Sequence, residues 1–207
     1  MKKTNGFLLA ITLILSIIPC LVFAGYQEGI DAFDRMDYQT AFKEFKMAAS
    51  QNDARGQFGL GVMYDLGEGV PQNFNKAAKW YELAAERDNA DAQNNLGALY
   101  ESGEGLPQDS KLAIKWYRRA AEGGNFDAPN NLGAMYLVGI GVARDYIRAY
   151  MWFDLAVRRK DKAARKNIIF VKLRMSPDQI AEAKQMADSW VEIYKNRVFK
   201  KQWQRLR

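Results

Sequence analysis

The sequence contains no histidine and a single cysteine, Cys20. The lack of histidine excludes a Ser-His-Asp triad, a histidine general base and a histidine-ligated zinc site. One thiol forms neither an internal disulfide nor a Cys₄ zinc site. Hydrophobic residues make up 48% of the 207 residues and charged residues 26%, as in a folded protein of one domain or two small ones. We therefore expect no metal and no cofactor, and any enzyme chemistry would rest on carboxylates or hydroxyls.

Residues 1–24 have the features of a secretory signal peptide. Two lysines precede an apolar stretch at residues 6–18, which is followed by Pro19 and by the small-x-small pattern Val22-Phe23-Ala24. We expect cleavage after Ala24 and a periplasmic or secreted protein. The alternative is an uncleaved membrane anchor, because residues 6–25 are about long enough to span a bilayer. Cleavage would remove the only cysteine, so the exported protein would be stabilised by packing without disulfides.

A period of 36 residues organises the middle of the chain. Leu60-Gly61, Leu96-Gly97 and Leu132-Gly133 follow one another at this spacing, each with a tyrosine three residues after the glycine. Each copy continues with a Gly-x-Gly pair and then with an alanine, a tryptophan, a second aromatic residue and another alanine. Aligned without a gap, residues 54–89 and 90–125 are identical at 18 of 36 positions. Self-similarity at a fixed period indicates a repeat protein.

Each copy is predicted to form two helices. The residues Ala77, Trp80, Tyr81 and Ala84 fall on one face of a helix and are predicted to be core. Before them, residues 65–71 contain two glycines and a proline, which indicates a turn between helices. Gly61 lies inside the first helix, where glycine costs about 1 kcal/mol relative to alanine. Its recurrence suggests that another helix approaches too closely for a Cβ, and such hairpins must stack to bury both faces.

At these residues the chain resembles the Sel1-like repeat family, a relative of the tetratricopeptide repeats with a longer loop between its helices. The family pattern, Ala-x₅-Leu-Gly-x-x-Tyr followed by Gly-x-Gly and Lys-Ala-x-x-Trp-Tyr-x-x-Ala-Ala, appears closely at residues 54–89 and 90–125. The third copy departs from it at Phe126, Phe153 and Val157. The resemblance implies an all-α fold, in which stacked helical hairpins form a right-handed α-α superhelix.

Both flanks of the repeats are predicted to be helical caps. Residues 25–53 fit a shorter hairpin of the ordinary tetratricopeptide type. Ser176-Pro177-Asp178-Gln179 is a capping box that starts a terminal helix, predicted to close the last repeat with residues 161–174 as its partner helix. The predicted segments are 1–24 (signal peptide), 25–53 (first hairpin), 54–89, 90–125 and 126–160 (repeats), 161–194 (capping helices) and 195–207 (basic tail).

The best candidate site is the concave surface that the first helices of such repeats line. Asn94 and Asn130 lie one period apart on it, and amides suit the main chain of an extended peptide because they both donate and accept hydrogen bonds. Small Ala98 and Ala134 would leave room for that peptide. The alternative is that these polar residues serve solubility alone. The predicted groove comprises Phe58, Val62, Asp65, Asn94, Asn95, Ala98, Glu101, Asn130, Asn131, Ala134 and Leu137.

Other motifs favour structural roles, so no catalytic residue is predicted. The Gly-x-Gly segments are interpreted as turns, since no strand precedes them and no Lys-Ser/Thr follows. Glu68 and Glu104 recur on equivalent loops, with Asp65 and Glu101 nearby. A catalytic carboxylate pair would normally occur once, so a solvated loop face is the preferred interpretation.

The sequence predicts an exported, non-enzymatic scaffold that binds a protein or peptide partner. The resemblance implies adaptors of envelope and signalling complexes. It also leaves open a β-lactam-binding or weakly hydrolysing enzyme and a secreted, host-directed effector. Cysteine-rich family members linked to β-lactams carry a cysteine pair in each repeat, which this chain lacks, and no Ser-x-x-Lys is present.

The C-terminal tail offers a second candidate surface. Residues 25–157 hold 13 basic and 19 acidic side chains, whereas residues 158–207 hold 15 basic and 5 acidic. An amphipathic basic helix would suit an anionic membrane or an acidic partner, while nucleic acid is not expected for an exported protein. A solvated tail, or one that folds back on the acidic repeats, is the alternative. The predicted contact residues are Lys195, Arg197, Lys200, Lys201, Trp203, Arg205 and Arg207.

Overall fold

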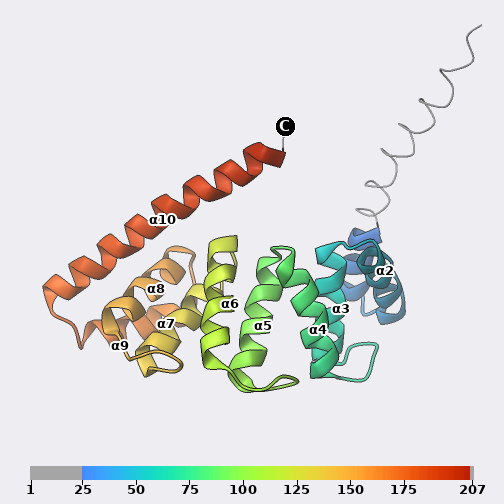
Figure 1. Cartoon of the computed structure of the whole chain (residues 1–207), viewed down its shortest axis with the longest axis horizontal. Coiled ribbons are helices and arrows are strands. Elements are labelled where there is room, and N and C mark those ends of the chain that lie inside the picture. The colour runs from blue at the N-terminus through green and yellow to red at the C-terminus, as the bar shows by residue number, and fades with distance from the viewer. Residues whose placement is uncertain (1–24, 206–207) are drawn as a thin grey trace, which may run out of the picture. The chain divides into compact units, whose positions relative to one another are not determined.

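The computed structural model describes residues 25–205, with side chains as far as Tyr194, and this range contains helices and no strand. The predicted signal peptide, residues 1–24, and the last two residues of the tail lie outside it. The chain divides into two compact units at Arg87 and Asp88, and each is described by itself. A helix at residues 25–34 is followed by α2 (Tyr38–Ser50), α3 (Ala54–Leu66), α4 (Phe74–Glu86), α5 (Ala90–Ser102), α6 (Ser110–Gly123), α7 (Ala128–Val138), α8 (Tyr146–Arg158), α9 (Lys162–Lys172) and α10 (Pro177–Arg205) (Figure 1).

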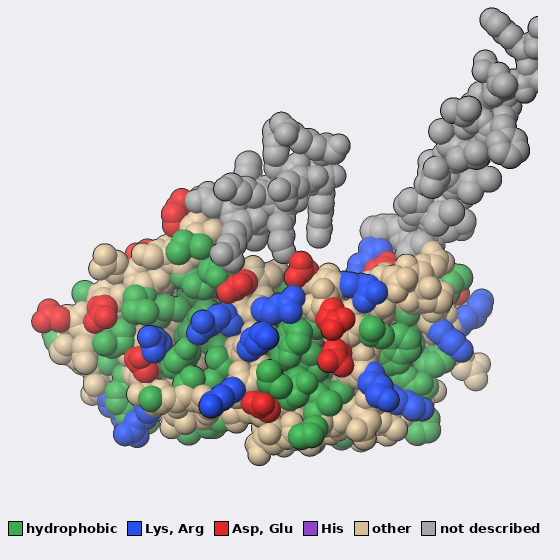
Figure 2. All heavy atoms as spheres, viewed as in Figure 1, with side chains coloured by type: hydrophobic (Ala, Val, Ile, Leu, Met, Phe, Trp, Pro, Cys, Tyr) green, Lys and Arg blue, Asp and Glu red, His purple; other side chains and the backbone are tan. Residues whose placement is uncertain are grey.

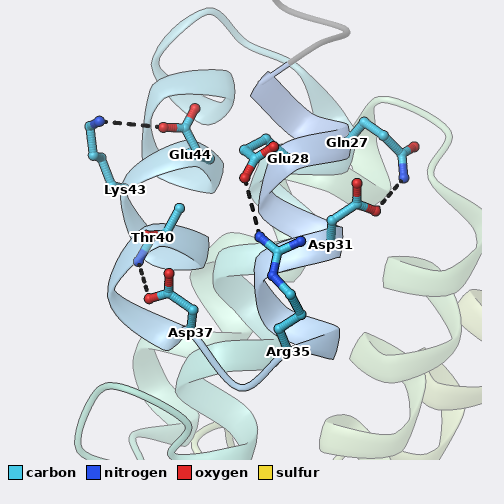
Figure 3. A network of polar contacts seen from close by, with 8 residues as sticks. All are labelled: Gln27, Glu28, Asp31, Arg35, Asp37, Thr40, Lys43 and Glu44. Atoms are coloured by element: carbon cyan, nitrogen blue, oxygen red, sulfur yellow. Dashed lines mark hydrogen bonds and ion pairs between the residues drawn. The ribbon is translucent and has the colours of Figure 1, made fainter.

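The first unit consists of two helical hairpins, the helix at residues 25–34 with α2 and then α3 with α4. Phe45 of α2 is buried among Leu60, Met63 and alanines of this unit. Polar side chains cover the outer side of the first hairpin (Figure 3). The amide of Gln27 donates to Asp31 at 3.0 Å, and Arg35 pairs with Glu28 at 3.3 Å. These groups are exposed, so their contribution to stability is small.

The second unit contains the hairpins α5–α6 and α7–α8, followed by α9 and α10. Its core is continuous from α6 to α10 and is centred on Tyr117, Met135 and Phe153. Most of these helices begin at an aspartate or asparagine whose side chain accepts a main-chain N–H, such as Asp109 at 3.0 Å from the nitrogen of Leu112.

Glycines turn the chain between the two helices of each repeat, as predicted. Gly67, Gly103 and Gly139 end the first helices with φ values of 75°, 80° and 88°, a left-handed conformation that other residues rarely adopt. The main-chain nitrogen of Gly67 donates to the carbonyl of Met63 at 2.9 Å.

The predicted close approach at the mid-helix glycine is confirmed. A Cβ added to Gly97 would lie 2.8 Å from the ring of Tyr117, which projects from the second helix of the same hairpin. The corresponding distance is 2.5 Å at Gly61, and at Gly133 it is 2.6 Å from Phe153. In each repeat, therefore, the aromatic residue after the tryptophan packs into the space that the missing glycine side chain leaves, which we call the glycine notch.

The tryptophans themselves differ from the prediction that all of them are core. Trp152 is buried, but Trp80 and Trp116 are only half-buried. The difference arises because Trp190 of α10 covers Trp152, with ring centroids 5.6 Å apart. Trp116 is covered in part by the guanidinium of Arg119, which lies 4.8 Å from its ring centroid.

The C-terminal helices agree with the predicted capping box but not with the predicted partnership. Ser176 Oγ accepts from the nitrogen of Gln179 at 3.2 Å, and Gln179 accepts in return from the nitrogen of Ser176 at 2.9 Å. The helix that this box starts, α10, runs back across α8 and does not lie along α9 over the described chain (Figure 1). No helix within residues 25–205 has both the length and the apolar character that a membrane crossing requires.

Candidate functional site

Asparagine side chains form a hydrogen-bonded row across the first helices of the second unit. Asn131 of α7 donates its Nδ2 to Oδ1 of Asn94 on α5 at 3.1 Å. Asn167 of α9 donates in the same way to Asn130 of α7 at 3.2 Å. Both bonds join residues 37 positions apart, so α7 and α9 are added in the same register. Asn94, Asn95, Asn130 and Asn131 of the predicted groove lie in or beside this row, and Asn167 extends it; that they bind a peptide stays a prediction.

Small side chains flank this row. Ala98 follows Asn94 by one helical turn and is exposed, while Ala134 follows Asn130 by one turn and is half-buried. An asparagine amide carries two N–H donors and an oxygen with two lone pairs, so the two bonds of Asn94, from Asn131 and to Asn95, use only part of its capacity. The mutual bonds hold the amides in fixed positions, and the small side chains of Ala98 and Ala134 leave space beside them. Such an arrangement suits the main chain of an extended peptide.

The acidic residues of the predicted groove have a structural partner. Tyr117 donates its hydroxyl to Glu101 Oε2 at 2.7 Å, and Tyr81 donates to Asp65 Oδ2 at 2.9 Å. Burial, followed by the hydrogen bond to Glu101, raises the pKa of Tyr117 well above its ordinary value of 10.0. The prediction of a wholly solvated carboxylate face is therefore wrong for Asp65 and Glu101, which are half-buried. They link the end of one helix to the buried tyrosine of the next.

The third repeat loses both members of this pair together. Leu137 stands where the acid would be, and Phe153 stands where the tyrosine would be. Leu137 is half-buried and Phe153 is fully buried. The predicted groove therefore changes from acidic to apolar between α5 and α7.

The remaining groove residues lie in the first unit. Phe58 and Val62 of α3 are half-buried, and the ring centroid of Phe58 lies 5.9 Å from that of Tyr81. With Asp65, they form a set on α3 that is described separately from the asparagine row. Whether any of these residues binds a ligand stays a prediction.

The predicted tail residues Lys195, Arg197, Lys200, Lys201, Trp203 and Arg205 belong to α10, whose backbone is helical to Arg205, but their side chains are outside the described part. Arg207 lies outside it altogether. Just before the tail, Tyr194 donates its hydroxyl to Glu122 of α6 at 2.6 Å. This bond joins α10 to α6 at the point where the basic segment begins.

Sequence reasoning missed Asn167, although a signal was present. Ala164, Asn167, Ile168 and Val171 stand 36 residues after Ala128, Asn131, Leu132 and Met135. The period therefore continues into α9, beyond the last glycine pair that marked the repeats. Among the residues that the structure describes, no group of three or more acidic or cysteine side chains is placed to hold a metal ion.

The Sel1 repeat profile matches residues 19–53, 54–89, 90–125 and 127–161. The structure is similar to that of a Sel1 repeat protein from Oxalobacter formigenes, with 35% identity and a TM-score of 0.63, over 68% of this chain and 58% of that one. It is also similar to c5321, a protective antigen present in uropathogenic Escherichia coli strains displaying an SLR fold, with 24% identity and a TM-score of 0.59, over 88% of this chain and 48% of that one. The chain thus spans less than two thirds of either relative. No curated protein matches it. The predicted fold class, an all-α solenoid of stacked helical hairpins, is confirmed.

Proposed function

Because the chain belongs to the Sel1 repeat family, we propose that it is a non-enzymatic scaffold that binds an extended peptide of a partner protein along the first helices of its repeats. Sel1 repeat proteins generally mediate protein–protein interactions, and their scaffold is generally non-catalytic. The observation that carries the proposal is the asparagine row, in which two interhelical amide bonds repeat the same register beside exposed Ala98.

Site-specific crosslinking in the native cell tests this surface. A photoreactive residue at Ala98, on α5, should capture a partner that is not captured from Lys115, an exposed position on α6. The double variant Asn94→Ala with Asn130→Ala should weaken the capture from position 98. It should stay folded by circular dichroism, with a loss of about 1–3 kcal/mol from the two interhelical hydrogen bonds that it removes. Equal capture from both positions, or capture that ignores the double variant, would show that the asparagine row is not the binding surface.

The proposal includes export to the periplasm or beyond. This part of the proposal is supported only by the sequence of residues 1–24. The first matched repeat starts at residue 19, so cleavage after Ala24 would remove its first six residues. Cell fractionation, together with N-terminal sequencing, should find a chain that begins at Gly25. A chain that retains residues 1–24 in the membrane fraction would favour the anchored alternative, and recovery from the medium would favour a secreted effector. Turnover of a chromogenic β-lactam by the purified chain would contradict the non-enzymatic proposal.

A second candidate function is contact with an anionic membrane through residues 195–207. The continuous helix of α10 supports it, because the helical backbone runs through Arg205. Within it, Phe199 and Trp203 are one helical turn apart among basic residues. The described face in Figure 2, by contrast, mixes basic and acidic side chains. Phosphatidylglycerol vesicles should bind the chain at low salt, and deletion of residues 195–207 should abolish this binding. Binding should fall as salt rises, because exposed charges are screened within about 8 Å at physiological ionic strength. Equal binding to neutral vesicles would contradict this function.

A further inference from the structure

By its register, α9 corresponds to the first helix of a fifth hairpin. Ala164 and Val171 are fully buried and belong to the core that α8 shares. The bond from Asn167 to Asn130 repeats the register of the preceding helix. The face of α9 that packs on the third repeat is therefore complete.

A hairpin also needs a second helix packed against the first, and no described helix fills this role for α9. In the three full repeats a glycine of the first helix receives an aromatic ring from the second. The equivalent position of α9 is Ile169, whose side chain is 61% exposed. The connection at residues 173–176 contains none of the glycines that turn the chain in the full repeats, and α10 packs against α8 instead. Within the described residues, α9 is thus a first helix without its partner.

The uncovered face of α9 combines apolar and basic side chains. Ile169, Phe170 and Leu173 are 61%, 46% and 79% exposed. The side chains of Arg165, Lys166, Lys172 and Arg174 are exposed beside them, and no acidic residue occurs from Lys162 to Pro177. The guanidinium of Arg174 lies 3.5 Å from the ring centroid of Phe170. We name Arg165, Ile169, Phe170, Lys172 and Leu173 the α9 face.

We propose that the α9 face binds an amphipathic helix of a partner protein, which takes the place of the second helix of the fifth hairpin. Charge complementarity selects the partner: acidic side chains along one edge of its apolar stripe would pair with Arg165 and Lys172, which lie two helical turns apart on the same edge of α9. Docking of an apolar helical face into such a surface is a common mode of recognition. This site is separate from the asparagine row and does not depend on it.

The residue at position 169 also sets a steric rule for the partner. In the full repeats glycine admits a tyrosine or phenylalanine ring, but the equivalent position of α9 carries the larger side chain of Ile169. The docked helix must therefore present a small residue, such as alanine, opposite Ile169. The chain's own α10 is already engaged, because Ala183 and Ala187 are fully buried and Trp190 packs edge-to-face against Trp152.

The test uses a synthetic helical peptide with leucine and alanine along one face and glutamate along both edges. The purified full chain should bind it in fluorescence anisotropy. A matched peptide with lysine in place of glutamate should bind at least about tenfold more weakly, which is about 1.4 kcal/mol. Ile169→Glu should weaken binding of the glutamate peptide by a similar factor, whereas Leu66→Glu, at a 59% exposed leucine of α3, should leave it unchanged.

A swap of side-chain size makes the test specific to the proposed geometry. The unmodified chain should prefer a peptide with alanine at the central position, and Ile169→Gly should shift the preference toward phenylalanine. Leu173→Glu serves as a second disruptive variant if circular dichroism shows that Ile169→Glu is unfolded. Absence of binding, equal binding of the lysine peptide, or an unchanged preference in Ile169→Gly would overturn the proposal. A dimer of the chain that Ile169→Glu dissociates would also overturn it, by showing that the occupant is a second copy.

Discussion

Gly97→Ala should destabilise the chain, although the same change in an open helix would stabilise it. Replacing glycine by alanine inside a helix gains about 1 kcal/mol from helix propensity. Here the new Cβ would lie 2.8, 2.9 and 3.3 Å from Cδ1, Cε1 and Cγ of Tyr117. The ring has little freedom to move, because Tyr117 is 1% exposed and its hydroxyl donates to Glu101 at 2.7 Å. Overpacking of this kind costs about 1–3 kcal/mol, so we expect a net loss of about 1 kcal/mol.

Urea unfolding, followed by circular dichroism, measures the effect. Ala98→Gly, at an exposed position of the same helix, isolates the propensity term and should cost about 1 kcal/mol. In a Tyr117→Leu background the notch is wider, so Gly97→Ala should become stabilising. A Gly97→Ala variant that is more stable than the unmodified chain would refute the argument that Tyr117 keeps glycine at this position.

Two further outcomes follow from the environment of the aromatic residues. Tyr117→Ala should cost about 3–5 kcal/mol of unfolding free energy, whereas Trp116→Ala should cost only about 1–2 kcal/mol because Trp116 is half-buried. If urea unfolding gives the reverse order, the assignment of Tyr117 to the core and Trp116 to the surface is wrong. The raised pKa of folded Tyr117 makes its contribution to stability complete below pH 10.0, the ordinary tyrosine value, and progressively lost as pH rises above it. Tyr117→Phe should therefore reduce the alkaline loss of stability, and an identical pH profile for the two chains would contradict this.

The repeating part of the fold could be predicted from the sequence because each local pattern has a local cause. Gly67 marks a left-handed turn, and Gly61 marks a close helix contact, and both signals recur at 36 residues. The unequal burial of Trp116 and Trp152 could not be predicted in this way. Their sequence environments are alike, and the difference comes from Trp190 of a helix outside the repeats.

The direction of α10 was beyond the sequence for a related reason. The capping box at Ser176 determines where the helix begins, but not which neighbour it meets. Its apolar positions, such as Ala183 and Trp190, fit any apolar helix face of suitable width. The choice of α8 over α9 depends on the short connection at residues 173–176 and on the contacts that α8 offers, which are properties of the assembled unit. For the same reason the sequence places Asn94 and Asn131 on one surface but does not predict the hydrogen bond between them.

The paired loss of acid and tyrosine in the third repeat yields a final prediction. Phe153→Tyr alone should be destabilising by about 1–3 kcal/mol, because the new hydroxyl would be buried beside Leu137 without an acceptor. Leu137→Glu alone loses apolar burial. Together the two changes create, in the third repeat, the equivalent of the Tyr117–Glu101 hydrogen bond. The double variant should therefore be more stable, by about 1.5–3 kcal/mol, than the sum of the two single effects predicts. Urea unfolding of the four chains gives this coupling. Purely additive effects would show that the hydrogen bond, although present at 2.7 Å in the second repeat, does not stabilise the hairpin.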